Sequence, residues 1–314
     1  MHRRDFFRTA AAIALPLWPA LSSVEGQTSV PRAQQPSAAY RRLTDGLGVL
    51  DVGGSNVLGS SADPRGLVLV DTGSRRPDGE LIAALQSVHP GATVQIAFNT
   101  HYHADQTGNN DAVATAGATI IAHEHTRQWM STGYWVPSEH RYEPPRAKVA
   151  WPAETFRVTG SLTAGSEQID YGHVPLAHTD GDIYVFFRAS NVLAVGEVAS
   201  PLRDPALDYF TGAWIGGRVD AMDAILSLSN DETRIIPAAG PPMTRAEFKT
   251  ERDMMEEVRS RIWARTLKGQ SPREMLDDGV MNGLPRTWKD PFKFLYDAAQ
   301  GMFAHHNKLD PSVI

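Results

Sequence analysis

The chain has 314 residues, of which 42% are hydrophobic and 21% charged, a balance typical of soluble globular proteins. A formal net charge of −6 without clustered basic residues excludes a nucleic-acid partner. The lack of cysteine excludes disulfides and thiolate metal ligands. A small-molecule substrate therefore remains among the classes of partner that these numbers allow.

The first 28 residues have the pattern of an export signal. Arg3 and Arg4 precede two aromatic residues, and a short apolar run follows over residues 9–21. This run is shorter than the about 20 residues that span a bilayer, so we expect a cleaved signal and no stable membrane anchor. The arginine pair resembles a twin-arginine signal, which implies the Tat export machinery as partner of the precursor and a periplasmic or secreted product. An ordinary secretory signal is the alternative. The predicted division is an export signal at 1–28, a flexible leader at 29–42 and a folded domain at 43–314.

Short strands and helices are predicted along the folded part of the chain. Strands are expected at 47–52, 56–60, 67–70, 94–98, 119–122, 156–158, 169–176, 183–187, 192–195 and 234–236. Helices are expected at 77–88, 108–116, 124–130, 219–228, 245–267 and 291–306. The dipeptide Asp180-Gly181 predicts a two-residue hairpin turn. Two blocks of strands followed by helices indicate an α/β domain in which two sheets pack face to face, with helices outside.

Two histidines and a carboxylate follow the strand predicted at 94–98. His101 and His103 are two residues apart, so they point the same way if the backbone stays extended. Two such imidazoles with Asp105 close behind form half of a metal site. The alternative is a polar loop that holds two histidines by chance.

The order of the motifs resembles the metallo-β-lactamase fold family from about residue 43 to 309. Asp71-Thr72-Gly73 matches its aspartate loop, and residues 101–106 match its His-x-His-x-Asp-His motif apart from the last position. Residues 177–182 resemble the segment with the third histidine, His178. The resemblance implies a four-layer αββα sandwich. It also implies a first metal site of His101, His103 and His178 that holds Zn²⁺.

The chain departs from this family at the second metal site. Gln106 and Ala239 stand where the family has histidines, and Glu197 stands where it has a bridging acid or thiol. Only Asp105 and Glu197 remain, whereas zinc usually takes three or four protein ligands. We therefore predict one tightly bound Zn²⁺ per chain and a second ion that is weak or absent.

Three carboxylates have candidate roles around this site. Asp105 is the candidate catalytic group, because it can accept a proton from a metal-activated water. The alternative role of Asp105 is to cap the helix predicted from residue 108. Glu197 is a candidate ligand, proton shuttle or salt-bridge partner. Asp71 is expected to brace the metal loop by hydrogen bonds. His123 and His125, also two apart, are expected away from the metal, and His173 is expected at an edge or surface.

Residues 131–152 show no clean period and hold Tyr134, Trp135 and Arg141. Aromatic and arginine side chains on a long irregular loop suggest a substrate lid. A structural excursion packed on the scaffold is the alternative.

The leading hypothesis is a metal-dependent hydrolase that acts on an ester, thioester, lactone or lactam. The first alternative is an inactive binding or accessory protein that keeps the fold, since two second-site histidines are missing. The second alternative is an altered two-metal hydrolase that uses Glu197.

Overall fold

The computed structural model describes residues 40–77, 79–136 and 140–307. The predicted export signal and the leader up to residue 39 lie outside the described residues. The last three residues of the predicted leader, Tyr40–Arg42, form strand β1 and pair with β2, so the folded part begins earlier than expected. Among the described residues, none of the helices is both long and apolar enough to cross a lipid bilayer.

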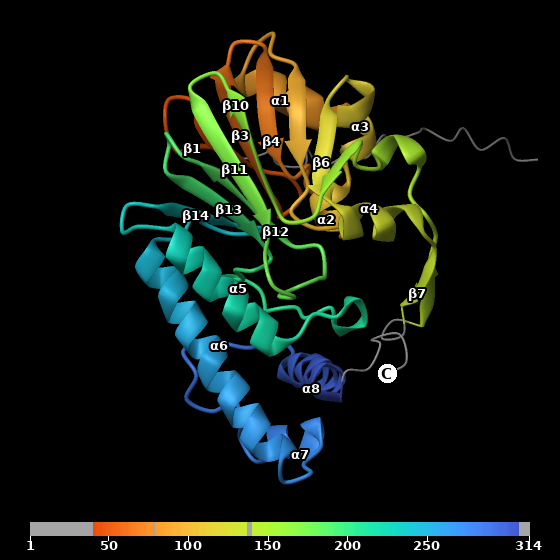
Figure 1. The fold of residues 1–314 in the computed structure, drawn as a ribbon, viewed down its shortest axis with the longest axis vertical. Helices are drawn as coiled ribbons and strands as arrows, with labels where there is room; N and C mark the ends of the chain where they lie inside the picture. Colours follow the sequence, from red (N-terminus) through yellow and green to blue (C-terminus); the bar gives the residue numbers. More distant parts are fainter. Residues whose placement is uncertain (1–39, 78, 137–139, 308–314) are drawn as a thin grey trace, which may run out of the picture. The chain divides into compact units, whose positions relative to one another are not determined.

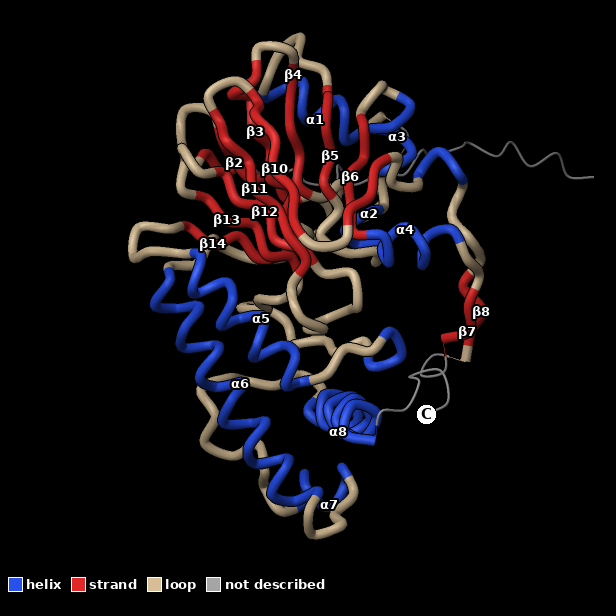
Figure 2. Tube along the Cα trace, in the orientation of Figure 1, coloured by secondary structure: helices blue, strands red, loops and turns tan. Residues whose placement is uncertain are grey.

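Two sheets form the centre of the fold (Figures 1 and 2). The first sheet has the strand order β1-β2-β3-β4-β5-β6-β9, and the second has the order β10-β11-β12-β13-β14. The strands of the first sheet after β1 are β2 (Leu47–Asp51), β3 (Asn56–Asp63), β4 (Gly66–Val70), β5 (Val94–Phe98), β6 (Thr119–His123) and β9 (Glu154–Phe156). Those of the second are β10 (Thr159–Ala164), β11 (Glu167–His173), β12 (Ile183–Phe187), β13 (Val192–Gly196) and β14 (Arg234–Pro237).

Strand β4 shows why the fold has layers. All five of its residues are buried, as expected of a strand covered on both faces. Val68 and Val70 pack with Ile183 and Val185 of the second sheet. The alternate residues Leu67 and Leu69 pack toward the helices instead.

Helices cover the outer face of each sheet. On the first sheet these are α1 (Glu80–Val88) and α3 (Asn110–Thr115), whose Leu81 and Val113 join the cluster of Leu67 and Leu69. On the second sheet Met222, Met255 and Leu295 join a common core with β13. They come from α5 (Ile215–Leu228), α6 (Arg245–Thr266) and α8 (Pro291–Asn307). The expected four-layer αββα sandwich is therefore confirmed.

Several local predictions were wrong. The helix predicted at 108–116 corresponds to α3, but α2 (Ala104–Thr107), β10 and α7 (Pro272–Asp277) were missed. The connection between β11 and β12 runs over residues 174–182 and is no two-residue hairpin turn. The segment after α4 (Glu124–Ser131) is more regular than expected. It contains a hairpin of β7 (Tyr134–Val136) and β8 (Arg141–Glu143), followed by the 3-10 turn η2 (Lys148–Ala150).

The loops that carry the candidate site meet at one edge of the two sheets. His101 and His103 follow the carboxyl end of β5, and Glu197 follows the end of β13. The amide of Ile183, at the start of β12, donates to the carbonyl of Thr100 at 3.0 Å. This hydrogen bond joins the 174–182 loop of the second sheet to the loop of the first sheet that carries His101 and His103.

Candidate metal centre

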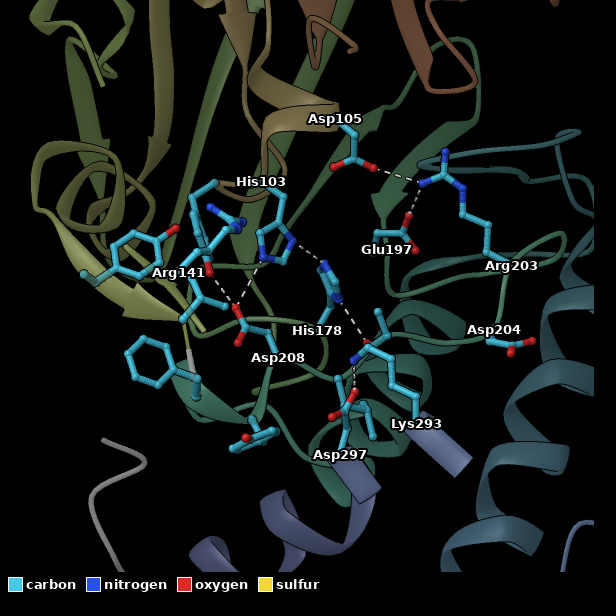
Figure 3. Close-up of a pocket in the computed structure, with 17 residues that line it drawn as sticks. His103, Asp105, Arg141, His178, Glu197, Arg203, Asp204, Asp208, Lys293 and Asp297 are labelled. Atoms are coloured by element: carbon cyan, nitrogen blue, oxygen red, sulfur yellow. Dashed lines mark hydrogen bonds and ion pairs between the residues drawn. The ribbon is translucent and has the colours of Figure 1, made fainter. Parts of the chain in front are cut away.

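His101, His103 and His178 converge although His178 is far from the other two in sequence. One ring nitrogen from each lies within 4.8 Å of the corresponding nitrogens of the other two. Their ring centroids form a nearly regular triangle, with separations of 5.0, 4.6 and 4.7 Å. His101 and His178 are buried, while His103 opens onto a cavity (Figure 3).

Each imidazole is oriented by a hydrogen bond from its other nitrogen, as in metal-ligating histidines generally. Thr100 donates its hydroxyl hydrogen to Asp71, so it accepts from His101, and the lone pair of His101 then lies on Nε2. His103 Nε2 faces the Asp208 carboxylate and His178 Nδ1 faces the Ala206 carbonyl, so these nitrogens carry the hydrogens. The lone pairs of the two rings then lie on His103 Nδ1 and on His178 Nε2. The three contacts are His101 Nδ1 to Thr100 Oγ1 at 3.2 Å, His103 Nε2 to Asp208 Oδ2 at 3.3 Å and His178 Nδ1 to the Ala206 carbonyl at 3.0 Å.

The remaining three nitrogens fit a divalent cation. His101 Nε2 is fully buried and has no hydrogen-bond partner among the described residues. His103 Nδ1 and His178 Nε2 face each other at 2.8 Å, where two lone pairs repel unless a cation or a proton lies between them. A buried donor atom without a partner is costly, and a metal ion bound by all three imidazoles removes that cost.

The electrostatics keep two of these ligands neutral. Burial lowers the pKa of His101 well below its ordinary value and lowers the pKa of His178 to about 3. Burial acts in the same direction on His103, but the hydrogen bond and the negative charge of Asp208 outweigh it and raise its pKa. Tyr102 holds Asp208 in place by donating its hydroxyl hydrogen to Oδ2 at 2.5 Å.

Asp71 supports the loop that precedes His101. Its two carboxylate oxygens accept from the amide and the hydroxyl of Thr100, both at 2.8 Å. Burial raises the pKa of Asp71 to about 8, although these two hydrogen bonds oppose the shift. Gly196 permits the close approach of β13, because a Cβ there would lie 2.7 Å from Thr100 Oγ1.

Arg203 joins the two remaining second-site carboxylates (Figure 3). Its Nη1 donates to Asp105 Oδ2 at 2.9 Å and to Glu197 Oε1 at 3.3 Å. Its Nη2 donates to the carbonyl of Gly54 at 2.7 Å. Although burial alone would raise the pKa of Asp105, the hydrogen bond from Arg203 and the nearby histidines lower it. A guanidinium cation thus lies between the two acids that remain from the family's second site.

The alternative role of Asp105 as a helix cap is wrong. Helix α2 begins at Ala104 with His103 as its N-cap, so Asp105 lies inside the first turn, and its carboxylate contacts Arg203. Glu197 is buried and also accepts from the Ser200 hydroxyl at 3.0 Å. Burial raises the pKa of Glu197, and the positive charge of Arg203 opposes this.

The loop after β13 carries most of the residues that support the metal centre and that the sequence did not reveal. Buried charged side chains hold this loop in place. Arg218, which is fully buried, donates to the Ser200 hydroxyl at 2.9 Å, and Glu251 accepts from the Ser200 amide at 2.9 Å. Arg286 donates to the carbonyls of Ser200 and Arg203. The C-terminal helical layer therefore fixes the loop that carries Arg203, Ala206 and Asp208.

A cavity of about 330 Å³ opens beside His103 and His178. Tyr134 and Arg141 line it, and Arg141 forms an ion pair with Glu143. Trp135 is absent from the lining residues and is 51% exposed. Of the three lid candidates, the structure therefore brings two to the site.

The other histidines lie elsewhere. His123 stacks on His173 with ring centroids 4.2 Å apart, and its Nε2 hydrogen-bonds to the carbonyl of Arg157. His173 is thus half-buried against another ring, on a strand between β10 and β12, instead of lying at an edge or surface as expected. His125 pairs with Asp180. In the part of the chain that the structure describes, His101, His103 and His178 are the one group suited to a metal ion.

The chain belongs to the metallo-beta-lactamase superfamily, whose family model matches residues 56–240. Members of this superfamily are mostly hydrolases that use a divalent metal, typically zinc. A search of curated proteins gave no match.

Solved structures with the same fold include a metallo-beta-lactamase from Pontibacter korlensis. It is 18% identical, with a TM-score of 0.58, and the match covers 70% of this chain and 99% of that one. DIM-1 metallo-beta-lactamase is 19% identical, with a TM-score of 0.55 and coverages of 70% and 98%. The sec-alkylsulfatase Pisa1 from Pseudomonas sp. is 15% identical, with a TM-score of 0.63, and the match covers 86% of this chain and 50% of that protein.

Proposed function

We propose that this protein is a hydrolase with one zinc ion, held by His101 Nε2, His103 Nδ1 and His178 Nε2, and that its substrate is an ester, thioester, lactone or lactam. The observation that carries the proposal is the convergence of three buried or half-buried imidazoles, each with one nitrogen left for a ligand. An ion bound there supplies Lewis-acid catalysis and a nucleophile from water at neutral pH.

The side chains of this chain divide the remaining work. Asp208 and the Ala206 carbonyl hold the rings of His103 and His178 in the orientation that keeps their ligand nitrogens available. Asp105 lines the cavity as a carboxylate of lowered pKa, so it is ionised at neutral pH and can accept a hydrogen bond that orients the attacking water.

Arg203 takes the place of the second cation. Its guanidinium supplies a fixed positive charge between Asp105 and Glu197, where a second divalent ion would otherwise balance two carboxylates. This contact disfavours the altered two-metal enzyme that uses Glu197, because Arg203 already pairs with that carboxylate. The contact also favours an active enzyme over the inactive binding or accessory protein, because the positive charge of Arg203 replaces that of the second metal ion.

Turnover with and without metal tests this function. We expect the mature protein to hydrolyse a chromogenic ester or lactam, to lose activity with a chelator and to regain it with about one equivalent of zinc. His103→Ala should remain inactive after the same addition, whereas Trp135→Ala, at an exposed residue on the hairpin, should behave like the wild type. Unchanged turnover by His103→Ala would overturn the proposal, and retained zinc without any turnover would favour the accessory protein.

We also propose export by the twin-arginine route to the periplasm or beyond, supported by Arg3 and Arg4 before a short apolar run. Cell fractionation should find the mature protein outside the cytoplasm. Replacing both arginines by lysine should retain the precursor inside. Unaltered export of that variant would indicate an ordinary secretory signal.

A further inference from the structure

The cavity beside the metal centre has one predominantly apolar wall. The hairpin contributes Tyr134 and Val136. Leu207 comes from the loop before the 3-10 turn η3 (Tyr209–Thr211), and Phe210 comes from η3 itself. His103 and His178, where the reaction is proposed, lie among the residues that line the same cavity (Figure 3). A ligand group that packs on this wall would therefore extend directly from the reacting centre.

This wall is fixed before any ligand binds, because its rings pack against one another. Trp129 stacks on Tyr102 with centroids 5.8 Å apart and meets Tyr134 edge-on at 5.1 Å. Phe210 lies 5.5 Å from Trp129 and stacks with Tyr134 at 6.1 Å. Such offset and edge-on pairs are the favoured arrangements of aromatic rings.

The charged groups of the cavity are already paired within the protein. Lys293 forms an ion pair with Asp297, and Asp204 accepts from the amides of Lys289 and Asp290, just before α8. Arg203 contacts Asp105 and Glu197. A charged substituent would have to displace one of these pairs, whereas an apolar substituent gains contact area without that cost.

We propose that the cavity takes a compact apolar group of the substrate, an aryl or short branched acyl group, against Tyr134, Leu207 and Phe210. The inference rests on the hydrolase function proposed above, since it treats His103 and His178 as the reacting end. At about 30 Å³ for each water-sized group, the cavity of about 330 Å³ has room for roughly eleven such groups. A phenylacetyl group, with eight carbons, fits this space, and an acyl chain of fourteen carbons exceeds it.

Direct binding of product-like acids tests the inference without requiring turnover. Calorimetry of the zinc-loaded protein should show phenylacetate binding at least tenfold more tightly than acetate or tetradecanoate. Phe210→Ala should remove most of that preference. Trp135→Ala, one residue from Tyr134 on the same strand and absent from the cavity wall, should retain it. Equal binding of acetate and phenylacetate, tighter binding of tetradecanoate, or an unchanged preference in Phe210→Ala would overturn the inference.

Kinetics on three thioesters of one thiol separates this inference from the proposed function. The phenylacetyl thioester should have about a tenfold higher kcat/KM than the acetyl and tetradecanoyl thioesters, and Phe210→Ala should lose this advantage mainly through KM. Hydrolysis without an acyl preference would overturn the pocket but leave the hydrolase. Selective binding of phenylacetate without hydrolysis of any ester, thioester or lactam would overturn the hydrolase but leave the pocket.

Discussion

Arg203 is the residue whose replacement has the most specific consequence. Removing its side chain leaves Asp105 and the buried Glu197 without their shared cation. Loss of one partner of a buried ion pair costs about 3–5 kcal/mol. The side chains of Arg203 and Asp105 are 38% and 36% exposed, so water screens part of this loss. We therefore expect Arg203→Ala to lower the free energy of unfolding by roughly 1–3 kcal/mol.

The same replacement should create affinity for a second ion. Two carboxylates alone are a weak zinc site, so Arg203→Ala should bind a second zinc only in excess metal. Adding Gln106→His and Ala239→His supplies two imidazoles. Gln106 is buried and contacts Ser55, next to Gly54, while Ala239 lines a second cavity that it shares with Arg203 and Gly54. Elemental analysis after dialysis should then find about two zinc ions per chain.

The matched control is Arg203→Lys, which keeps a positive charge at this position. This variant should bind about one zinc ion per chain, like the wild type. Circular dichroism and thermal unfolding verify that each variant is folded. Two zinc ions in the wild type with Arg203 intact would refute the reasoning. So would a folded triple variant that still holds one.

Three further predictions concern the supports of the site. Asp208→Asn should weaken zinc binding about 10–100-fold in competition with a chelator, because His103 loses its carboxylate partner; Asp297→Asn, in the same cavity, should not. Burial raises the folded-state pKa of Asp71 to about 8, above its unfolded value, so the folded protein holds an extra proton up to that pH. The ion-free wild type should therefore lose stability between pH 7 and 8, by at most about 1.4 kcal/mol per pH unit, and Asp71→Asn should flatten this slope in thermal unfolding. Arg286→Ala should lower stability by about 1–3 kcal/mol and loosen zinc, with partial rescue by lysine, because two loop carbonyls lose their donor; unchanged zinc affinity would limit Arg286 to a structural role.

The sequence predicts the elements whose signals are local. Strand β5 lies where the apolar run predicts it, and the two histidines follow it directly. The four layers were predicted from the two blocks of strands and helices. Apolar strands such as β4 support that prediction, because a strand covered on both faces must bury all of its residues. His178 required the order of motifs in a known family, since only the fold brings it to the other two histidines.

Arg203 and Asp208 could not be predicted because their roles depend on contacts between distant residues. Arg203 and Asp105 are 98 positions apart, and Asp208 and His103 are 105 apart. Both residues lie in a loop without hydrophobic period. The Asp-Gly pair at 180–181 was misleading for a related reason. It resembles a tight turn, but Asp182 accepts from the amides of His178 and Thr179 and holds a longer loop instead.

The zinc content of the purified wild type and of His178→Ala tests the central claim most directly. Elemental analysis of protein prepared with zinc and then dialysed should give about one ion per chain in the wild type. It should give almost none in the variant, because two imidazoles and water hold the ion too weakly. A wild type that holds no zinc, or a folded His178→Ala that keeps the full amount, would contradict the account.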